Sequence, residues 1–183
     1  GELDEAPMLY IGEKLGNGNG LAVDIAVDPV EGTNFVANNL PGSMSVIVIA
    51  NKGNLFNAPE TYMEKLATGS HIPNECLDLD FTVEKNIQNY SDVTSKKLSD
   101  ITVCILDRPR HKEIINELMK LNVNIKLITD GDVYGALAVT DKKYNIDIFM
   151  GTGGGPEGVI AAAALRSLKC RFQGRFLFKS EDE

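Results

Sequence analysis

The sequence predicts an α/β fold with α+β character in its first half, and three observations lead to this prediction. Alternating apolar residues early in the chain end in an acidic turn, which is typical of a strand. Two apolar runs then flank a short turn that contains glycine, which indicates an antiparallel hairpin. From residue 101 onward, strand-like and helical segments alternate, as they do where helices cover a parallel sheet.

In the first half, a helical stretch is expected at residues 7–15 and a strand at residues 22–28, where Val23, Ile25 and Val27 alternate. Strands are also expected at residues 44–50 and 54–57, paired across the turn at residues 51–53. The polar residues 83–100 are expected to link the two halves. We therefore predict two units, residues 1–98 with a mixed or antiparallel sheet and residues 99–183 with an open parallel α/β sheet.

In the second half, strands are expected at residues 101–106, 125–129 and 146–150. A helix after the first of them carries one apolar face, made of Ile114, Ile115, Leu118 and Met119. Loops that begin near Arg108, Asp130 and Gly153 each follow the C-terminus of a strand. Ligands collect at this edge of open α/β sheets, so the three loops are expected to share one site.

Composition excludes several functional classes. The chain has 183 residues, 43% of them hydrophobic, and a net charge of −8, which argues against nucleic acid or an anionic membrane as its main partner. No apolar stretch has membrane-spanning length, and residues 1–5 do not resemble a signal peptide. Three cysteines without paired spacing suggest reduced thiols. We expect a cytoplasmic protein.

Asp28 and Glu31 form the first candidate site. They lie three positions apart across Pro29 and before Gly32, so both carboxylates can converge on one point. Two converging carboxylates repel unless a cation lies between them, and without His or Cys nearby the expected cation is Mg²⁺ or Mn²⁺. The alternative is an ordinary turn from strand to helix, in which Asp28 or Thr33 caps the helix.

The second candidate site is the glycine-rich segment at residues 151–158. It follows an apolar run and precedes a helical one, and Pro156 suits the first turn of a helix. Consecutive glycines leave backbone N–H groups free to approach an anion, and Glu157 would place a carboxylate beside it. The alternative is a flexible connector whose acid complements the helix dipole.

Segments spread over nearly the whole chain resemble the class II (GlpX-type) fructose-1,6-bisphosphatases. They are residues 1–13 (GELDEAPMLYIGE), 28–33 (DPVEGT), 57–59 (NAP), 62–66 (YMEKL), 108–111 (RPRH), 130–132 (DGD) and 153–158 (GGGPEG). The second segment also resembles the metal-binding signature of the lithium-sensitive phosphatase superfamily, which includes the inositol monophosphatases, with Glu31 where those usually have Asp.

The resemblance implies a layered sugar-phosphatase fold and a set of site residues. The implied metal ligands for Mg²⁺ or Mn²⁺ are Asp28, Glu31 and Glu157, and Thr33 would align the attacking water, so that Asp28, Glu31 and Thr33 form the catalytic set. The implied substrate contacts are Glu31, Gly32, Thr33, Tyr62, Arg108, Pro109, Arg110, Asp130, Gly131, Asp132 and Gly154. Guanidinium groups would hold the second phosphate, and the aspartates would accept hydrogen bonds from sugar hydroxyls.

Without the family, these residues have simpler interpretations. Arg108 and Arg110 would lie in a solvated basic turn that opens a helix. Asp130 and Asp132 would belong to an ordinary turn, and Tyr62 would be half buried with its hydroxyl in water.

The expected activity is hydrolysis of the 1-phosphate of fructose 1,6-bisphosphate, with sedoheptulose 1,7-bisphosphate as a possible second substrate. Two alternatives stay open: an inositol-phosphate or nucleotide phosphatase of the same superfamily, and a catalytically silent sugar-phosphate-binding module. The resemblance also implies a homo-oligomer (dimer or tetramer). We further expect a fragment of the full enzyme, since the chain opens at Gly1 without Met and family members extend beyond both ends.

Overall fold

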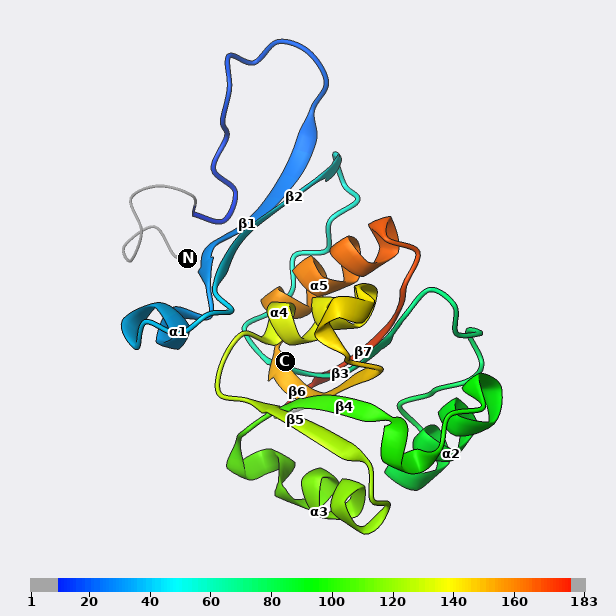
Figure 1. Ribbon diagram of the computed structural model, residues 1–183. Coiled ribbons are helices and arrows are strands. Elements are labelled where there is room, and N and C mark those ends of the chain that lie inside the picture. The colour runs from blue at the N-terminus through cyan, green and yellow to red at the C-terminus, as the bar shows by residue number, and fades with distance from the viewer. Residues whose placement is uncertain (1–9, 179–183) are drawn as a thin grey trace.

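Two β-sheets and the helices beside them make up residues 10–178, the part of the chain that this computed structural model describes (Figure 1). The strands are β1 (Val23–Glu31), β2 (Met44–Asn51), β3 (Tyr62–Thr68), β4 (Thr102–Leu106), β5 (Asn124–Ile128), β6 (Ile148–Gly154) and β7 (Arg171–Leu177). The α-helices are α1 (Thr33–Ala37), α2 (Val83–Thr94), α3 (Lys112–Lys120), α4 (Asp132–Leu137) and α5 (Gly155–Ser167). Short 3₁₀ turns are η1 (Leu98–Asp100), η2 (Pro109–His111), η3 (Ala138–Thr140) and η4 (Lys142–Tyr144).

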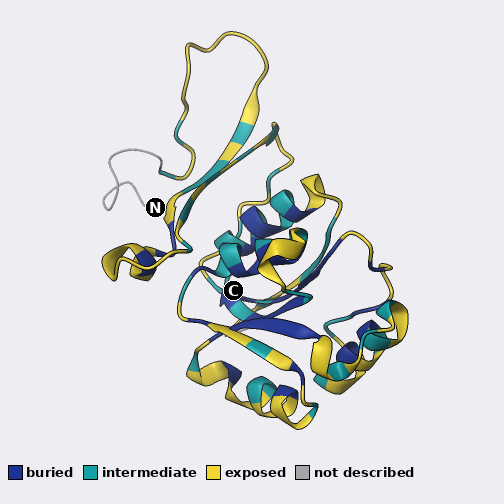
Figure 2. Cartoon of the chain, viewed as in Figure 1, coloured by how far each residue is buried: buried dark blue, intermediate teal, exposed yellow. Residues whose placement is uncertain are grey.

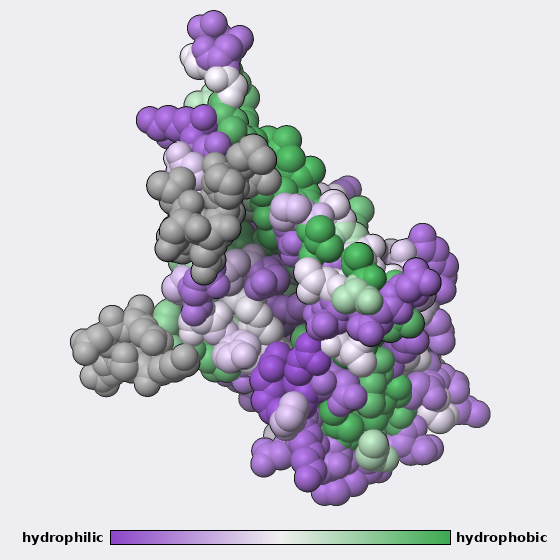
Figure 3. Space-filling model, turned by 90° about the vertical axis from the view of Figure 1, so that its left-hand side faces the viewer, coloured by the Kyte–Doolittle hydropathy of each residue, from purple (hydrophilic) through white to green (hydrophobic). Residues whose placement is uncertain are grey.

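β1 and β2 form an antiparallel ribbon that extends from the rest of the molecule (Figure 1). Ile25 pairs with Ile49, and both side chains lie on one apolar face with Ile47, which is 63% exposed. Hydrophobic residues gather along this ribbon in Figure 3. The strand expected at residues 44–50 is confirmed, but the hairpin with residues 54–57 is wrong: those residues form no strand, and β2 pairs with β1.

The larger sheet has five strands in the order β5-β4-β6-β3-β7. β4 runs parallel to β5 and β6, which confirms the parallel arrangement expected after residue 101. The sheet as a whole is mixed, because β3 lies between β6 and β7 and is antiparallel to both. The predicted boundary between residues 98 and 99 stays a prediction, although β3 joins strands from beyond it.

Alternate residues of the central strands face two separate apolar cores. On one face Leu66, Val103 and Ile148 pack with residues of α2 and α3. On the other face Ala67, Cys104 and Phe149 pack with residues of α4 and α5. Figure 1 shows these helix pairs on opposite sides of the sheet, and Figure 2 shows β4 buried between them. A strand covered on both faces reads as a continuous apolar run, as β4 does.

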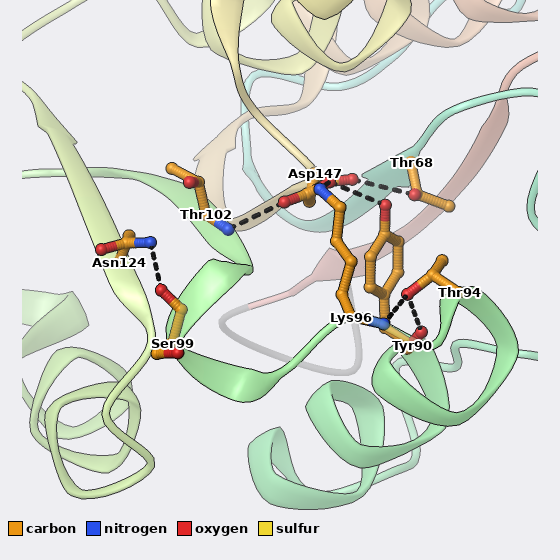
Figure 4. A network of polar contacts seen from close by, with 8 residues as sticks. All are labelled: Thr68, Tyr90, Thr94, Lys96, Ser99, Thr102, Asn124 and Asp147. Atoms are coloured by element: carbon orange, nitrogen blue, oxygen red, sulfur yellow. Dashed lines mark hydrogen bonds and ion pairs between the residues drawn. The ribbon is translucent and has the colours of Figure 1, made fainter.

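Residues 83–100 are not the linker that their polar composition suggested. They form α2, whose Thr82 cap accepts a hydrogen bond from the backbone N–H of Lys85, and the turn η1. The hydroxyl of buried Tyr90 donates to Asp147 Oδ1 at 2.9 Å, and Lys96 Nζ lies 2.6 Å from the same oxygen (Figure 4). Asp147 Oδ2 accepts the backbone N–H of Thr102 at 2.9 Å. This network joins α2 to the starts of β4 and β6.

Three other expectations about helices have different outcomes. Residues 10–15 are not helical, and residues 7–9 of that predicted stretch lie outside the described residues. In α3, Leu118 is buried and Ile114 packs on the core, but Met119 is 61% exposed, so the expected apolar face is narrower than predicted. Pro156 does lie in the first turn of a helix, α5. Within residues 10–178, no helix has the length and apolar character needed to span a membrane.

Candidate active site

Glu31, the last residue of β1, is a buried acid that reaches the start of α4. Its side chain is 5% exposed, and Oε1 accepts a hydrogen bond of 2.7 Å from the backbone N–H of Val133. Burial, together with the nearby carboxyl of Asp28, raises the pKa of Glu31 to about 8. A carboxyl in this environment takes up a proton or a cation near neutral pH.

Asp28 and Glu31 approach each other because the strand is irregular between them. The register of β1 against β2 shifts at this point, and Asp28 Oδ1 accepts the backbone N–H of Val30 at 3.0 Å. Gly32 then takes a left-handed conformation with φ of 76°, where a Cβ atom would lie 2.8 Å from the ring of Phe35. The tight bend expected at Gly32 is therefore confirmed, and it leaves Thr33 exposed as the first residue of α1.

A buried ion pair between Lys65 and Asp132 lies next to these acids. Lys65 Nζ contacts Asp132 Oδ2 and donates to the carbonyl oxygen of Gly154 at 2.6 Å, and its side chain is 1% exposed. The other carboxylate oxygen of Asp132 is buried and has no hydrogen-bond partner among the described residues. Sequence reasoning gave Lys65 no role. Its place beside Glu64, between the apolar residues Met63 and Leu66 of β3, was the available signal.

The glycine-rich segment is not a loop, which corrects the prediction. Residues 151–154 are the end of β6, and α5 begins directly at Gly155. Gly153 and Gly154 leave room for two carboxylates: a Cβ on Gly153 would lie 2.0 Å from Asp132 Oδ2, and one on Gly154 would lie 1.9 Å from Glu157 Oε2. Glu157 Oε2 is itself buried without a hydrogen-bond partner in the described part of the chain.

Asp130 and Gly131 connect the turn after β5 to α1. Asp130 Oδ2 accepts the backbone N–H of Asn34 at 2.9 Å. Gly131 has φ of 81°, and a Cβ there would lie 2.9 Å from the ring of Phe35. The ribbon and the larger sheet therefore meet at this turn, and the carboxylate of Asp130 is already engaged in holding them together.

Arg110 and Tyr62 form a second group beside the end of β6. The guanidinium carbon of Arg110 lies 4.9 Å from the centroid of the Tyr62 ring. Arg110 also donates two hydrogen bonds to the carbonyl oxygen of Thr152, from Nε at 2.9 Å and from Nη2 at 2.7 Å. Arg108 is half buried and donates to the carbonyl of Asp107 at 3.2 Å, and Pro109 begins η2.

The end of β6 joins the two groups. Thr152 contacts Arg110, Gly154 contacts Lys65, and Tyr62 pairs with Gly154 in the sheet. The loops after β4 and β5 are also adjacent, because the N–H of Asp107 donates to the carbonyl of Ile128 at 2.8 Å. The structure thus brings most of the sequence-predicted residues to one edge of the sheet. Their chemical roles stay predictions.

The described residues offer oxygen donors for a hard cation but no complete cage. Among residues 10–178, no three His, Cys, Asp or Glu side chains gather as a metal-binding group. The acids Glu2, Asp4 and Glu5 lie outside the described residues. The buried Glu31 and the unpartnered oxygen of Glu157 nevertheless offer the carboxylate oxygen that Mg²⁺ and Mn²⁺ prefer.

Comparison with known proteins shows the family of this chain. The family model for bacterial fructose-1,6-bisphosphatase, glpX-encoded, matches residues 1–183. A Prochlorococcus marinus (strain NATL1A) protein named D-fructose 1,6-bisphosphatase class 2/sedoheptulose 1,7-bisphosphatase is 46% identical over 178 residues, which are 97% of this chain and 53% of that protein. Fructose-1,6-bisphosphatase 1 class 2 of Escherichia coli (strain K12) is 43% identical over 181 residues, which are 99% of this chain and 54% of the relative. The chain spans about half the length of these relatives, and it belongs to the glpX-encoded bacterial fructose-1,6-bisphosphatase family.

Proposed function

We propose that this chain carries the substrate-recognition edge and part of the metal site of a phosphatase that converts fructose 1,6-bisphosphate to fructose 6-phosphate. Sedoheptulose 1,7-bisphosphate is the proposed second substrate, as the name of the Prochlorococcus relative suggests. The observation that carries the proposal is the meeting of an acidic group, at Glu31 and Asp132, with a basic and aromatic group, at Arg110 and Tyr62, around the end of β6. A bisphosphate needs both groups, because the acidic group serves the phosphate that is hydrolysed and the basic group holds the other phosphate.

In this proposal Asp28, Glu31 and Glu157 hold Mg²⁺ or Mn²⁺. When bound, the metal would lower the pKa of a water molecule and neutralise charge on the phosphoryl group. Thr33, exposed at the start of α1, aligns the attacking water through its hydroxyl. Gly32 supports this position, because its left-handed conformation turns the chain from Glu31 directly into α1.

Arg108 and Arg110 hold the phosphate that is not hydrolysed. Nε and Nη2 of Arg110 donate to the carbonyl oxygen of Thr152, and these two hydrogen bonds orient the guanidinium. Nη1 then points its N–H groups to a phosphate oxygen of the substrate. Tyr62 stacks on the same guanidinium. Pro109 fixes the backbone between the two arginines.

Asp130, Gly131 and Asp132 contact the sugar in this proposal. The free oxygen Oδ1 of Asp132 accepts a hydrogen bond from a sugar hydroxyl, while the contact of Oδ2 with Lys65 orients the carboxylate. Gly154, without a side chain, lets the substrate approach the backbone where β6 ends.

A catalytically silent sugar-phosphate-binding fragment is the second candidate. It is favoured by one observation, that residues 10–178 gather no three-ligand metal group. The inositol-phosphate or nucleotide phosphatase alternative depends only on residues 28–35, and it gives Arg110 no second phosphate to bind. We therefore rank it last.

The experiment measures phosphate release with Mg²⁺ or Mn²⁺ from fructose 1,6-bisphosphate, fructose 1-phosphate, fructose 6-phosphate and inositol 1-phosphate. It is done on this chain and on a chain completed to the length of the Escherichia coli relative with that relative's segments. Bisphosphate-selective turnover that Asp28→Asn abolishes supports the proposal. Binding of the bisphosphate without turnover in either chain supports the silent module, and preference for inositol 1-phosphate would overturn both.

The remaining features belong to the same proposal. We propose a cytoplasmic homo-oligomer (dimer or tetramer) with the layered sugar-phosphatase fold and with separate units at residues 1–98 and 99–183. The exposed apolar face of the β1–β2 ribbon is consistent with a surface that becomes covered on assembly. Sedimentation velocity on the completed chain tests the oligomeric state, and a monomer at micromolar concentration would exclude it.

A further inference from the structure

His111, at the end of η2, is a buried histidine to which the proposed mechanism gives no task. Its side chain is 1% exposed, and both ring nitrogens are engaged. Nδ1 lies 2.7 Å from the carbonyl oxygen of Leu106, and Nε2 accepts the backbone N–H of Thr152 at 2.7 Å. A carbonyl can only accept and an amide N–H can only donate. Nδ1 therefore carries the proton and Nε2 carries none, so this geometry requires a neutral imidazole.

The neighbouring residues Arg110 and His111 thus bind the backbone carbonyl and the backbone N–H of Thr152. Arg110 donates twice to the carbonyl of Thr152, and His111 accepts its N–H. The neighbouring Gly151 has φ of 142°, and a Cβ there would lie 3.1 Å from the imidazole. Gly151 therefore gives the ring room and adopts a conformation that other residues rarely take.

We propose that His111 is a positioning residue for Arg110. The imidazole of His111 fixes the backbone of Thr152, and the carbonyl of Thr152 holds the Arg110 guanidinium over the Tyr62 ring. In this position the guanidinium contacts the second phosphate of the substrate. This inference rests on the proposed function only in its last step, the contact with phosphate. Protonation of Nε2 by solvent replaces the acceptor with a donor, so the bond to the Thr152 N–H is lost and the hold on Arg110 loosens.

The surroundings of His111 favour its neutral form at physiological pH. Burial lowers the pKa of His111 below its ordinary value of 6.5, and the positive charge of Arg110 lowers it further. Asp132 opposes this by attracting a proton, and the carbonyl of Leu106 does the same. The hold on Thr152 is therefore intact at pH 7–8 and is lost only as the pH falls through this lowered pKa.

The first test needs no enzymatic activity. The chain has two histidines, and the other, His71, is exposed, so nuclear magnetic resonance can follow each ring separately between pH 5 and 8. We expect the exchange protection of the Thr152 amide to fall about tenfold with the protonation of His111. The titration of His71 should leave Thr152 unchanged. The proposal is overturned if Thr152 keeps its protection while His111 charges, or if His111 stays neutral until the protein unfolds.

The second test is kinetic and uses His111→Phe, which keeps a planar aromatic ring but makes neither hydrogen bond, with His71→Gln as the matched control. At pH 8 we expect His111→Phe to raise KM for fructose 1,6-bisphosphate about tenfold while kcat stays within about twofold. The rise of KM toward acid pH should be smaller in this variant than in the wild type. The positioning role would be refuted if His111→Phe had the same KM as the wild type and the same rise of KM toward acid pH.

A second variant separates positioning from folding. His111→Gln can still accept the Thr152 N–H, and we expect it to recover part of the lost affinity. If the wild type releases no phosphate from any substrate, the proposed function fails, and the amide exchange of Thr152 still decides whether His111 holds that peptide.

Discussion

Replacing Lys65 by Met tests the ion pair on which the acidic group depends. The Lys65 side chain is 1% exposed, so the substitution removes a buried cation that contacts Asp132 and the carbonyl of Gly154. Asp132 already has one buried oxygen without a partner in the described residues, so the variant would leave its charge uncompensated. Breaking a buried pair in this way costs about 3–5 kcal/mol of unfolding free energy, which corresponds to a fall in Tm of roughly 10 °C for a chain of this size.

Urea denaturation at pH 7, followed by circular dichroism, measures this loss. Lys143→Met is the matched control, because Lys143 pairs with Asp141 at the surface, where solvent screens the pair and it contributes little to stability. The double variant Lys65→Met/Asp132→Asn removes both charges and should recover more than half of the loss. The reasoning is refuted if Lys65→Met unfolds within about 1 kcal/mol of the wild type, or if the double variant is no more stable than the single one.

Three further predictions concern pH, recognition and the fold. The pKa of Glu31 rises from 4.5 in the unfolded chain to about 8 in the folded one, so the metal-free protein should lose stability as the pH rises through this interval. Urea denaturation at pH 5, 7 and 9 measures this loss, and Glu31→Gln should make the stability depend less on pH. Arg110→Lys cannot donate twice to Thr152 from a rigid fork, so KM for fructose 1,6-bisphosphate should rise about tenfold while Tm changes little; an unchanged KM would argue against this grip. Asp147→Asn should lower the free energy of unfolding, measured in urea, by about 2–4 kcal/mol, because it leaves the ammonium of Lys96 without a counter-charge and weakens the hydrogen bond from Tyr90. A loss as small as that of Lys143→Met would show that this network contributes little to stability.

The sequence could predict those strands whose residues carry their own signal. β1 alternates, β4 is a nearly continuous apolar run and β6 begins with one, so these strands could be placed from the sequence, except for the glycine-rich end of β6. β3 was missed because Glu64 and Lys65 interrupt its apolar pattern and because its partners lie far along the chain. The pairing of β2 with β1 was missed because a local turn signal suggested a nearer partner.

The candidate site, like the strands, was predictable only where the residues involved lie close together in the sequence. The spacing of Asp28 and Glu31 already indicated convergence, since only a short bend separates them. The contacts of Lys65 with Asp132 and of His111 with Thr152 join residues that are dozens of positions apart. These contacts depend on strand register, which no local motif specifies. The helix α2 was missed because its buried face has few apolar residues, Ile87 and Tyr90 among them.

The position of β3 in the middle of the larger sheet has a consequence for how the protein is made. β3 leaves the ribosome before β6 and β7, but Tyr62 pairs with Gly154 and Leu177, which are synthesised much later. Such long-range pairing makes folding slow, since a long loop must close before any contact forms. Until β6 and β7 arrive, both edges of β3 are open to other chains, so chaperone supply and growth temperature should limit the yield of this protein more than its final stability does.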